Sequence, residues 1–378
     1  MVFMFVTIIA FILILSVLVL VHELGHYLVA KFFKIKVEEF GFGFPPRVFG
    51  KKIGETIYSI NLLPIGGFVK LYGEDDAGGG SIKIKNQATS YKLQATEGEL
   101  GRAFYVRPLW QRITVVIAGV VMNFFLAVVL ISTLFATVGV AVPTEKVIVN
   151  EVQSGSPAET SGMLAKDEIL TVNSKDIKSS EEFIKIVDES SGEQISLLIL
   201  RGSEEIEISL TPRTKVPEGE GPIGVVITSI QIKKYSWLEA PFYGTLEALN
   251  FSKLIVTGLG GLVADLVTTG KAPEGVAGPV GVAQLTGVVV QNGPVATLWF
   301  VSLLSLNLAV LNILPIPALD GGRFFFQLIE LVTRKKVSPR YEGYAHAAGL
   351  VILLSLMVLI TVFDVGRLIS GQSLIPNM

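Results

Sequence analysis

The chain has 378 residues, half of which are hydrophobic (50%), and carries a net charge of −2 at pH 7. Its mean hydropathy of +0.59 is too high for an ordinary soluble enzyme and indicates a membrane protein. The near-neutral charge argues against a nucleic-acid partner. The absence of cysteine excludes disulfides, thiolate zinc sites and cysteine nucleophiles.

The first apolar stretch, residues 1–21, leads into a predicted transmembrane helix over 1–30, long enough for a hydrocarbon core of roughly 30 Å. It has no basic start and no small-residue cleavage site, so we interpret it as a retained helix rather than a signal peptide. Lys31, Lys34 and Lys36 follow at once. The positive-inside rule then places this end in the cytoplasm and the N-terminus outside.

The run Val21-His22-Glu23-Leu24-Gly25-His26 lies inside this helix, roughly 8–13 Å from its basic edge at 1.5 Å per residue. Ionisable side chains at membrane depth are costly and therefore indicate function. His22 and His26 are one helical turn apart and can bind one metal ion, with Glu23 beside them to accept a proton from a metal-bound water. The alternative is a pair of interfacial histidines, which a position inside an apolar helix makes less plausible.

Residues 37–72 predict β-structure punctuated by glycine and proline, including Gly41 and Gly43. The segment is unusually apolar for a cytosolic hairpin, so we expect it to dip into the bilayer, where protein or a water cavity must cover its backbone. A polar, mobile loop is expected over 74–101.

A second charge-free span follows Arg112 and contains Asn123, which is either a helix–helix contact or part of a site. Residues 144–214 change character: acidic residues become common, and short alternating strands flank one helix. The run from Ser154 to Asn173 resembles a PDZ domain of the kind found in bacterial proteases. Such a domain either binds extended peptide by strand addition or only fills space.

Residues 235–270 are apolar but carry four charges, which favours helices lying at the outer interface over a span. A third charge-free stretch, 295–319, runs inward to two prolines that bend the chain and bring in Asp320. A fourth span is expected over 345–363. His346 at its inner end is interpreted as interfacial rather than catalytic.

Only three histidines occur, so a third ligand for His22 and His26 must be a carboxylate or His346. Zinc prefers roughly tetrahedral nitrogen and oxygen ligands, and a catalytic site keeps one position for water. Asp320, at the predicted depth of the histidines, is the candidate third ligand. Glu23 would serve as base and then as acid to the leaving amine.

With these residues in place, the chain resembles the bacterial site-2 proteases, intramembrane zinc metalloproteases of the RseP type. The resemblance covers nearly the whole chain, with one PDZ domain between the second and third spans. It is carried by the following runs: His22 to His26, Gly41-Phe42-Gly43, Gly278-Pro279-Val280-Gly281, and Asn312 to Gly322, which matches N-x-x-P-x-P-x-L-D-G-G.

The resemblance implies Zn2+ bound by His22, His26 and Asp320, with Glu23 catalytic. It also implies a substrate-binding role for Asn312 and a hairpin that presents substrate as an extended strand. The hairpin residues expected to contact the substrate strand are Gly41, Gly43 and the edge position Ile60. Asn123, which is also expected to contact substrate, matches the family asparagine after Ala118-Gly119, although Val120 replaces the usual proline.

The family reading implies a multi-pass protein of the bacterial inner membrane, with its N-terminus and PDZ domain outside. Its partners would be the lipid bilayer and single-span membrane proteins already cut outside, such as anti-sigma factors and signal-peptide remnants. A peptide at the PDZ domain is a further possible partner.

The expected architecture is a four-span α-helical membrane protein with a membrane-dipping β-hairpin and an inserted α+β PDZ domain. Its segments are a first span (1–30), a cytoplasmic-side β region and loop (31–105), a second span (106–142), the PDZ domain (144–214), a connector (215–294), a third span with L-D-G-G (295–333) and a fourth span (345–370).

Two rival functions remain. A CAAX-type membrane zinc protease also has H-E-x-x-H but takes its third ligand from a distal glutamate, for which Glu330 is the candidate. A membrane-anchored PDZ adaptor with a dead metal site is the non-enzymatic reading, and the intact set of His22, Glu23, His26 and Asp320 argues against it.

Overall fold

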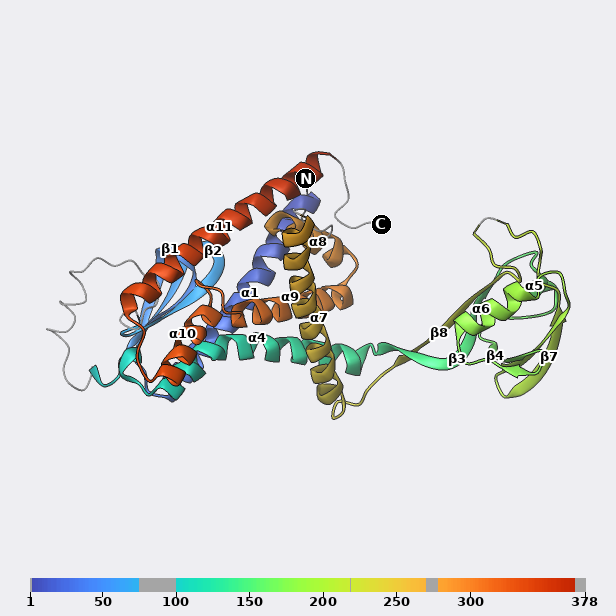
Figure 1. The fold of residues 1–378 in the computed structure, drawn as a ribbon, viewed down its shortest axis with the longest axis horizontal. Coiled ribbons are helices and arrows are strands. Elements are labelled where there is room, and N and C mark those ends of the chain that lie inside the picture. The colour runs from blue at the N-terminus through green and yellow to red at the C-terminus, as the bar shows by residue number, and fades with distance from the viewer. Residues whose placement is uncertain (1, 75–99, 218, 270–277, 371–378) are drawn as a thin grey trace. The chain divides into compact units, whose positions relative to one another are not determined.

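The computed structural model describes residues 2–74, 100–217, 219–269 and 278–370 (Figure 1). The chain forms two compact units, one of residues 1–136 with 236–378 and one of residues 137–235. Within the described residues, four helices are long and apolar enough to cross a membrane. This confirms the predicted four-span architecture. Most of the loop expected over 74–101 lies outside the described residues.

The four spans belong to α1 (Val2–Phe32), α4 (Leu109–Thr137), α9 (Pro294–Ile313) and α11 (Pro339–Ile369). Each is a long run of apolar residues with few charges, as a bilayer requires, and Glu23 of α1 is an exception that lies well inside its span.

The segment expected as one third span, 295–333, is divided in the structure. Helix α9 ends at Ile313, and a separate helix α10 (Asp320–Thr333) begins at the aspartate. Pro315 and Pro317 cannot donate helical hydrogen bonds, so α9 ends before the first proline and the chain turns. Asp320 therefore starts a new helix instead of ending a span.

Two further helices precede α9. Helix α7 (Ala240–Thr269) is a single helix of 30 residues that packs against α9, where interfacial helices were expected. It is not among the four candidate spans of the described chain. Helix α8 (Pro279–Gln291) packs against α1 and α11.

Strands β1 (Val37–Ile53) and β2 (Thr56–Leu71) form the predicted hairpin. Both strands bend, so residues 39–42 of β1 pair with residues 57–60 of β2 on one side and with 67–70 on the other. Ile60 faces Phe42 and Phe49 on its two sides and is an interior position. The expectation that Ile60 lies at an edge is wrong. Among the described residues, the outer segments of this sheet are 47–53 and 66–71, each paired with a strand on one side.

The turn of this hairpin is tied to the end of α1 and to the chain before α4. Glu55 accepts hydrogen bonds from Lys31 Nζ and Arg102 Nη2, each at 2.8 Å. The bonds from Arg102, followed by those from Lys31, hold the pKa of Glu55 at about 2, well below its usual value. The carboxylate is therefore ionised at neutral pH and anchors the sheet beside α1.

The second unit is the inserted α+β domain. Its five-strand path runs β7-β6-β4-β3-β8, and β5 pairs with β4. Strand β8 (Val225–Lys233) pairs with β3 (Val140–Val152), so the unit extends to residue 235, beyond the predicted end at 214. The remaining elements are β4 (Glu168–Val172), β5 (Lys175–Asp176), β6 (Ile195–Arg201), β7 (Glu204–Leu210), α5 (Pro157–Thr160) and α6 (Ser180–Glu189).

The core of this domain explains the alternating pattern of its strands. Ile195, Leu197 and Ile199 of β6 are fully buried, whereas the residues between them are not. One face of the sheet packs against Phe183 and Val187 of α6, as the two-residue period of a half-buried strand predicts.

Candidate active site

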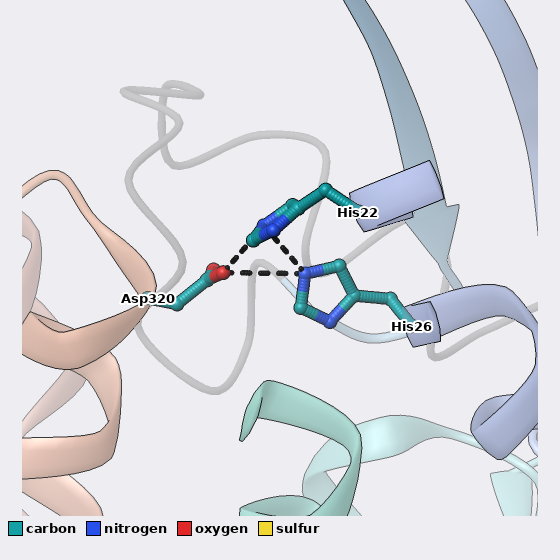
Figure 2. Close-up of side chains that lie close together, drawn as sticks. All are labelled: His22, His26 and Asp320. Carbon is teal, nitrogen blue, oxygen red and sulfur yellow. Dashed lines mark hydrogen bonds and ion pairs between the residues drawn. The ribbon is translucent and has the colours of Figure 1, made fainter. Parts of the chain in front are cut away.

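His22, His26 and Asp320 converge at one point between α1 and the start of α10 (Figure 2). His22 Nε2 lies 2.8 Å and His26 Nε2 3.2 Å from Asp320 Oδ2, and the two Nε2 atoms are 3.2 Å apart. Ligands of a tetrahedral zinc ion at about 2.0–2.1 Å are separated by roughly 3.3 Å. The three donor atoms are therefore spaced as ligands of a single ion.

Helix α4 leaves room for both imidazoles through Gly119. A Cβ at this position would lie 2.5 Å from His26 Nε2 and 2.7 Å from His22 Nε2. Gly25 on α1 makes room for the backbone of α4, because a Cβ there would lie 2.4 Å from the Ala118 carbonyl oxygen. The two glycines let α1 and α4 approach closely with the histidine pair between them.

The Nδ1 atom of each histidine faces a polar group of α4, which leaves Nε2 for a metal. His26 Nδ1 donates to the Val115 carbonyl oxygen at 2.8 Å. Asn123 lies with its amide nitrogen 3.4 Å from His22 Nδ1, and its buried Oδ1 has no hydrogen-bond partner among the described residues. Half a turn of the amide would let Oδ1 accept from Nδ1–H. Metal-binding histidines usually donate this second N–H to a fixed acceptor.

Asp320 is brought to the histidines by a tight reversal of the chain. A Cβ at Gly321 would lie 1.9 Å from the Leu314 carbonyl oxygen, and one at Gly322 would lie 2.6 Å from that of Ile316. The loop between α9 and α10 thus folds back over the first turn of α10. This close approach is the physical reason for two glycines after the aspartate.

Two ion pairs fix α10. Arg112 Nη2 of α4 lies 2.6 Å from Glu330 Oε1, and Arg323 pairs with Glu74, just beyond β2. Both pairs are largely buried, so removing one partner would leave an uncompensated charge. Glu330 is thus committed to Arg112. The described residues grouped as a possible metal site are His22, His26 and Asp320, which does not support the CAAX-type alternative.

Glu23 faces a cavity of about 460 Å³ that also reaches His26 and Asp320. The walls include the edge of β2 at Phe68 and Val69, and Gly67 would place a Cβ 3.7 Å from Glu23 Cγ. A carboxylate, a ligand cluster and a free strand edge therefore share one space. The arrangement can hold a water, a base and an extended peptide together.

The remaining predicted site residues are dispersed. Asn312 is half-buried in the last turn of α9. Gly41 lies under the Phe68 ring. Gly43 has φ +76, and a Cβ there would lie 2.3 Å from the Leu63 carbonyl oxygen. Both glycines therefore shape the bent sheet. Asn123 is fully buried behind His22, a position that suits ring orientation rather than the expected substrate contact.

Comparison with known proteins places this geometry in a family. The model of peptidase family M50 matches residues 10–356. A Clostridium acetobutylicum relative is 34% identical and covers 96% of this chain and 98% of its own length. The regulator of sigma-W protease RasP of Bacillus subtilis is 31% identical, with 96% and 99% covered. The zinc metalloprotease RasP of Geobacillus kaustophilus is also 31% identical, with 96% and 98% covered.

These matches identify the class as membrane-embedded metallopeptidases. The chain belongs to peptidase family M50, and the predicted resemblance to the site-2 proteases is confirmed. Together with the four candidate spans, the match makes the chain a multi-pass membrane peptidase.

Several residues of the site carried no signal in the sequence. Gly119 and the Val115 carbonyl act on α1 from α4, and Arg323 lines the cavity from α10. Their contributions depend on packing between segments far apart in the chain. Of these, Gly119 alone belongs to a motif, the Ala118-Gly119 pair of the family resemblance.

Proposed function

We propose that the protein is an intramembrane zinc endopeptidase that cleaves transmembrane segments of single-span proteins. His22, His26 and Asp320 would hold the ion, which when bound would polarise a water molecule and the scissile carbonyl. The observation that carries the proposal is that Glu23 faces one cavity with His26 and Asp320, two members of the ligand cluster, inside the membrane-spanning unit.

Glu23 handles the protons in this scheme. Its carboxylate accepts a proton from the attacking water and then delivers it to the leaving nitrogen, so that it returns to its starting state. The half-buried position keeps bulk solvent from competing for that proton. His22 and His26 would hold the ion through Nε2, and the Val115 carbonyl oxygen fixes the His26 ring by accepting from Nδ1–H.

Substrate would reach Glu23 along the free edge of β2, residues 66–71. A transmembrane helix hides its carbonyl groups in internal hydrogen bonds, and unpaired groups at membrane depth cost several kcal/mol. Pairing with a strand edge replaces those bonds while the segment unwinds. Asn312 would hold the same extended backbone by its side-chain amide.

The orientation proposed here follows the basic residues. Lys31 lies in the last turn of α1, Lys34 and Lys36 follow that helix, and Arg334 to Lys336 follow α10. This places the site nearer the cytoplasmic face of a bacterial cell membrane, with the N-terminus and the PDZ domain outside. Anti-sigma factors and signal-peptide remnants are the proposed substrate classes, and the PDZ domain is proposed to dock or filter them.

The test separates metal binding from proton transfer. Glu23→Gln should reduce cleavage of a transmembrane model substrate at least 1000-fold, on the order of the loss of an essential base, and should retain one zinc per chain. His22→Ala and Asp320→Ala should lose both cleavage and zinc. Cleavage and elemental analysis of purified protein give the two readouts. Full activity in Glu23→Gln would contradict the mechanism, and a zinc-free parent protein would support the inactive adaptor.

A further inference from the structure

The loop that delivers Asp320 adopts an uncommon backbone conformation. Ala318, two residues before the aspartate, has φ +79, in the left-handed region that residues with a Cβ rarely occupy. Such a conformation persists where surrounding groups enforce it. Something outside the loop must therefore hold Ala318 in place.

That contact comes from α11. His346 Nδ1 accepts a hydrogen bond from the Ala318 backbone N–H at 2.8 Å. The ring is only 5% exposed, so the bond satisfies a donor that water would otherwise have to reach. A nitrogen that accepts carries no proton, so the ring proton is on Nε2. Nε2 lies 3.9 Å from Glu342 Oε1, one turn earlier on the same helix.

A second contact from α11 meets the neighbouring residue of the loop. Gly349 follows His346 by three residues and thus lies on the same helix face. A Cβ at Gly349 would lie 2.5 Å from the Pro317 carbonyl oxygen and 2.6 Å from Pro317 Cβ. Pro317 rests on the bare backbone of α11 while Ala318 is held by His346.

We propose that His346 is a positioning residue for the metal ligand Asp320. Gly349 contributes by letting Pro317 pack directly against the backbone of α11. Only Leu319 separates Ala318 from the ligand, and the two glycines after Asp320 are also packed against this loop. Fixing Ala318 therefore fixes where the Asp320 carboxylate meets the two Nε2 atoms. The proposal rests on the proposed function, in which Asp320 binds zinc, and adds α11 as the element that sets its position.

The test compares side chains at position 346 whose hydrogen-bond acceptor lies at two different distances from the backbone, or is missing. In His346→Asn, Oδ1 takes nearly the place of Nδ1 and can still accept from Ala318, whereas in His346→Gln the acceptor is one bond farther out. His346→Leu has no acceptor. Zinc affinity of the full chain in detergent is measured by competition with a chelator, alongside kcat and KM for a transmembrane substrate.

We expect His346→Leu and His346→Gln to weaken zinc binding about 10- to 100-fold, as loss of a supporting contact typically does, with kcat lowered and KM unchanged. His346→Asn should stay within about threefold of the parent. Ile352→Ala, at an exposed position on α11, is the matched control and should change neither quantity.

Parental zinc affinity in folded His346→Leu would overturn the proposal, as would equal losses in the asparagine and glutamine variants. Since those two differ only in where the acceptor lies, their comparison decides even if the leucine variant does not fold. If the Asp320→Ala variant retained zinc, the proposed function would be overturned, independently of His346.

Discussion

The imidazole rings of His22 and His26 occupy the space that a side chain at position 119 of α4 would need. Gly119 has both Nε2 atoms within 2.7 Å of where its Cβ would be, a distance that real Cβ atoms essentially never show. The neighbouring contact is helix backbone against helix backbone at Gly25. The histidines of α1 therefore fit only because position 119 of α4 has no side chain.

We predict that Gly119→Ala weakens zinc binding at least about tenfold, a loss of roughly 1.4 kcal/mol in binding free energy, because the added methyl group displaces both imidazoles. Gly258→Ala in α7 is the control, since nothing lies within 4 Å of the Cβ it adds. Chelator competition on both purified variants measures the difference. Unchanged zinc affinity in Gly119→Ala would mean that α4 yields to the methyl group.

Residue type and spacing were sufficient to predict that His22, His26 and Asp320 meet, because one helical turn and one break in a span determine where they lie. They were not sufficient for His346. Its acceptor role depends on α11 passing the loop before Asp320, and a lone histidine near the end of a span is equally compatible with an interfacial position. Contacts between distant helices leave no local pattern.

At the scale of elements, the hairpin shows how a correct prediction of type can misplace an edge. Alternation and glycine placement predicted strands over 37–72, and β1 and β2 cover that range. The bend in both strands brings residues 39–42 between two segments of β2, so Ile60 is interior. Likewise β8 was missed because it pairs with β3, some eighty residues earlier in the chain.

The outward side of the edge strand can be assigned from two hydrogen bonds. The Tyr72 N–H donates to the Lys36 carbonyl oxygen, toward β1, whereas the Leu71 N–H points to the Glu74 carboxylate. Alternation along the strand places the Val69 N–H on the same side as that of Leu71, facing the cavity with Glu23. Val69 is thus the donor that an incoming strand would meet.

We predict that Val69→Pro slows cleavage of a helical transmembrane substrate about 2- to 10-fold, the worth of one hydrogen bond of roughly 0.5–1.5 kcal/mol, while zinc content is unchanged. Proline removes the donor without adding charge. Val48→Pro, in the opposite, exposed edge segment, is the matched control. If both variants lose the same activity, the hairpin acts as a membrane anchor and strand addition is wrong.

The molecule as a whole is arranged with basic residues at two points that the membrane topology must bring to one side. One is the connection from α1 to β1, with Lys31, Lys34 and Lys36. The other is the connection between α10 and α11, with Arg334 to Lys336. Between them, α4 and α9 each cross the membrane once, with the inserted domain at residues 137–235 in between. Only one assignment of sides satisfies the positive-inside rule at both points.

That assignment is testable because the chain has no cysteine, so any labelling reports the introduced thiol alone. Ser203 in the inserted domain and Ser338 before α11 are both exposed serines, which makes their cysteine variants a matched pair. We predict that an impermeant thiol reagent added to intact cells labels Ser203→Cys and leaves Ser338→Cys unlabelled. After permeabilisation, both should be labelled to the same extent, which controls for reactivity. The reverse pattern in intact cells would put the inserted domain in the cytoplasm and the zinc site near the outer face, which would contradict the proposed orientation.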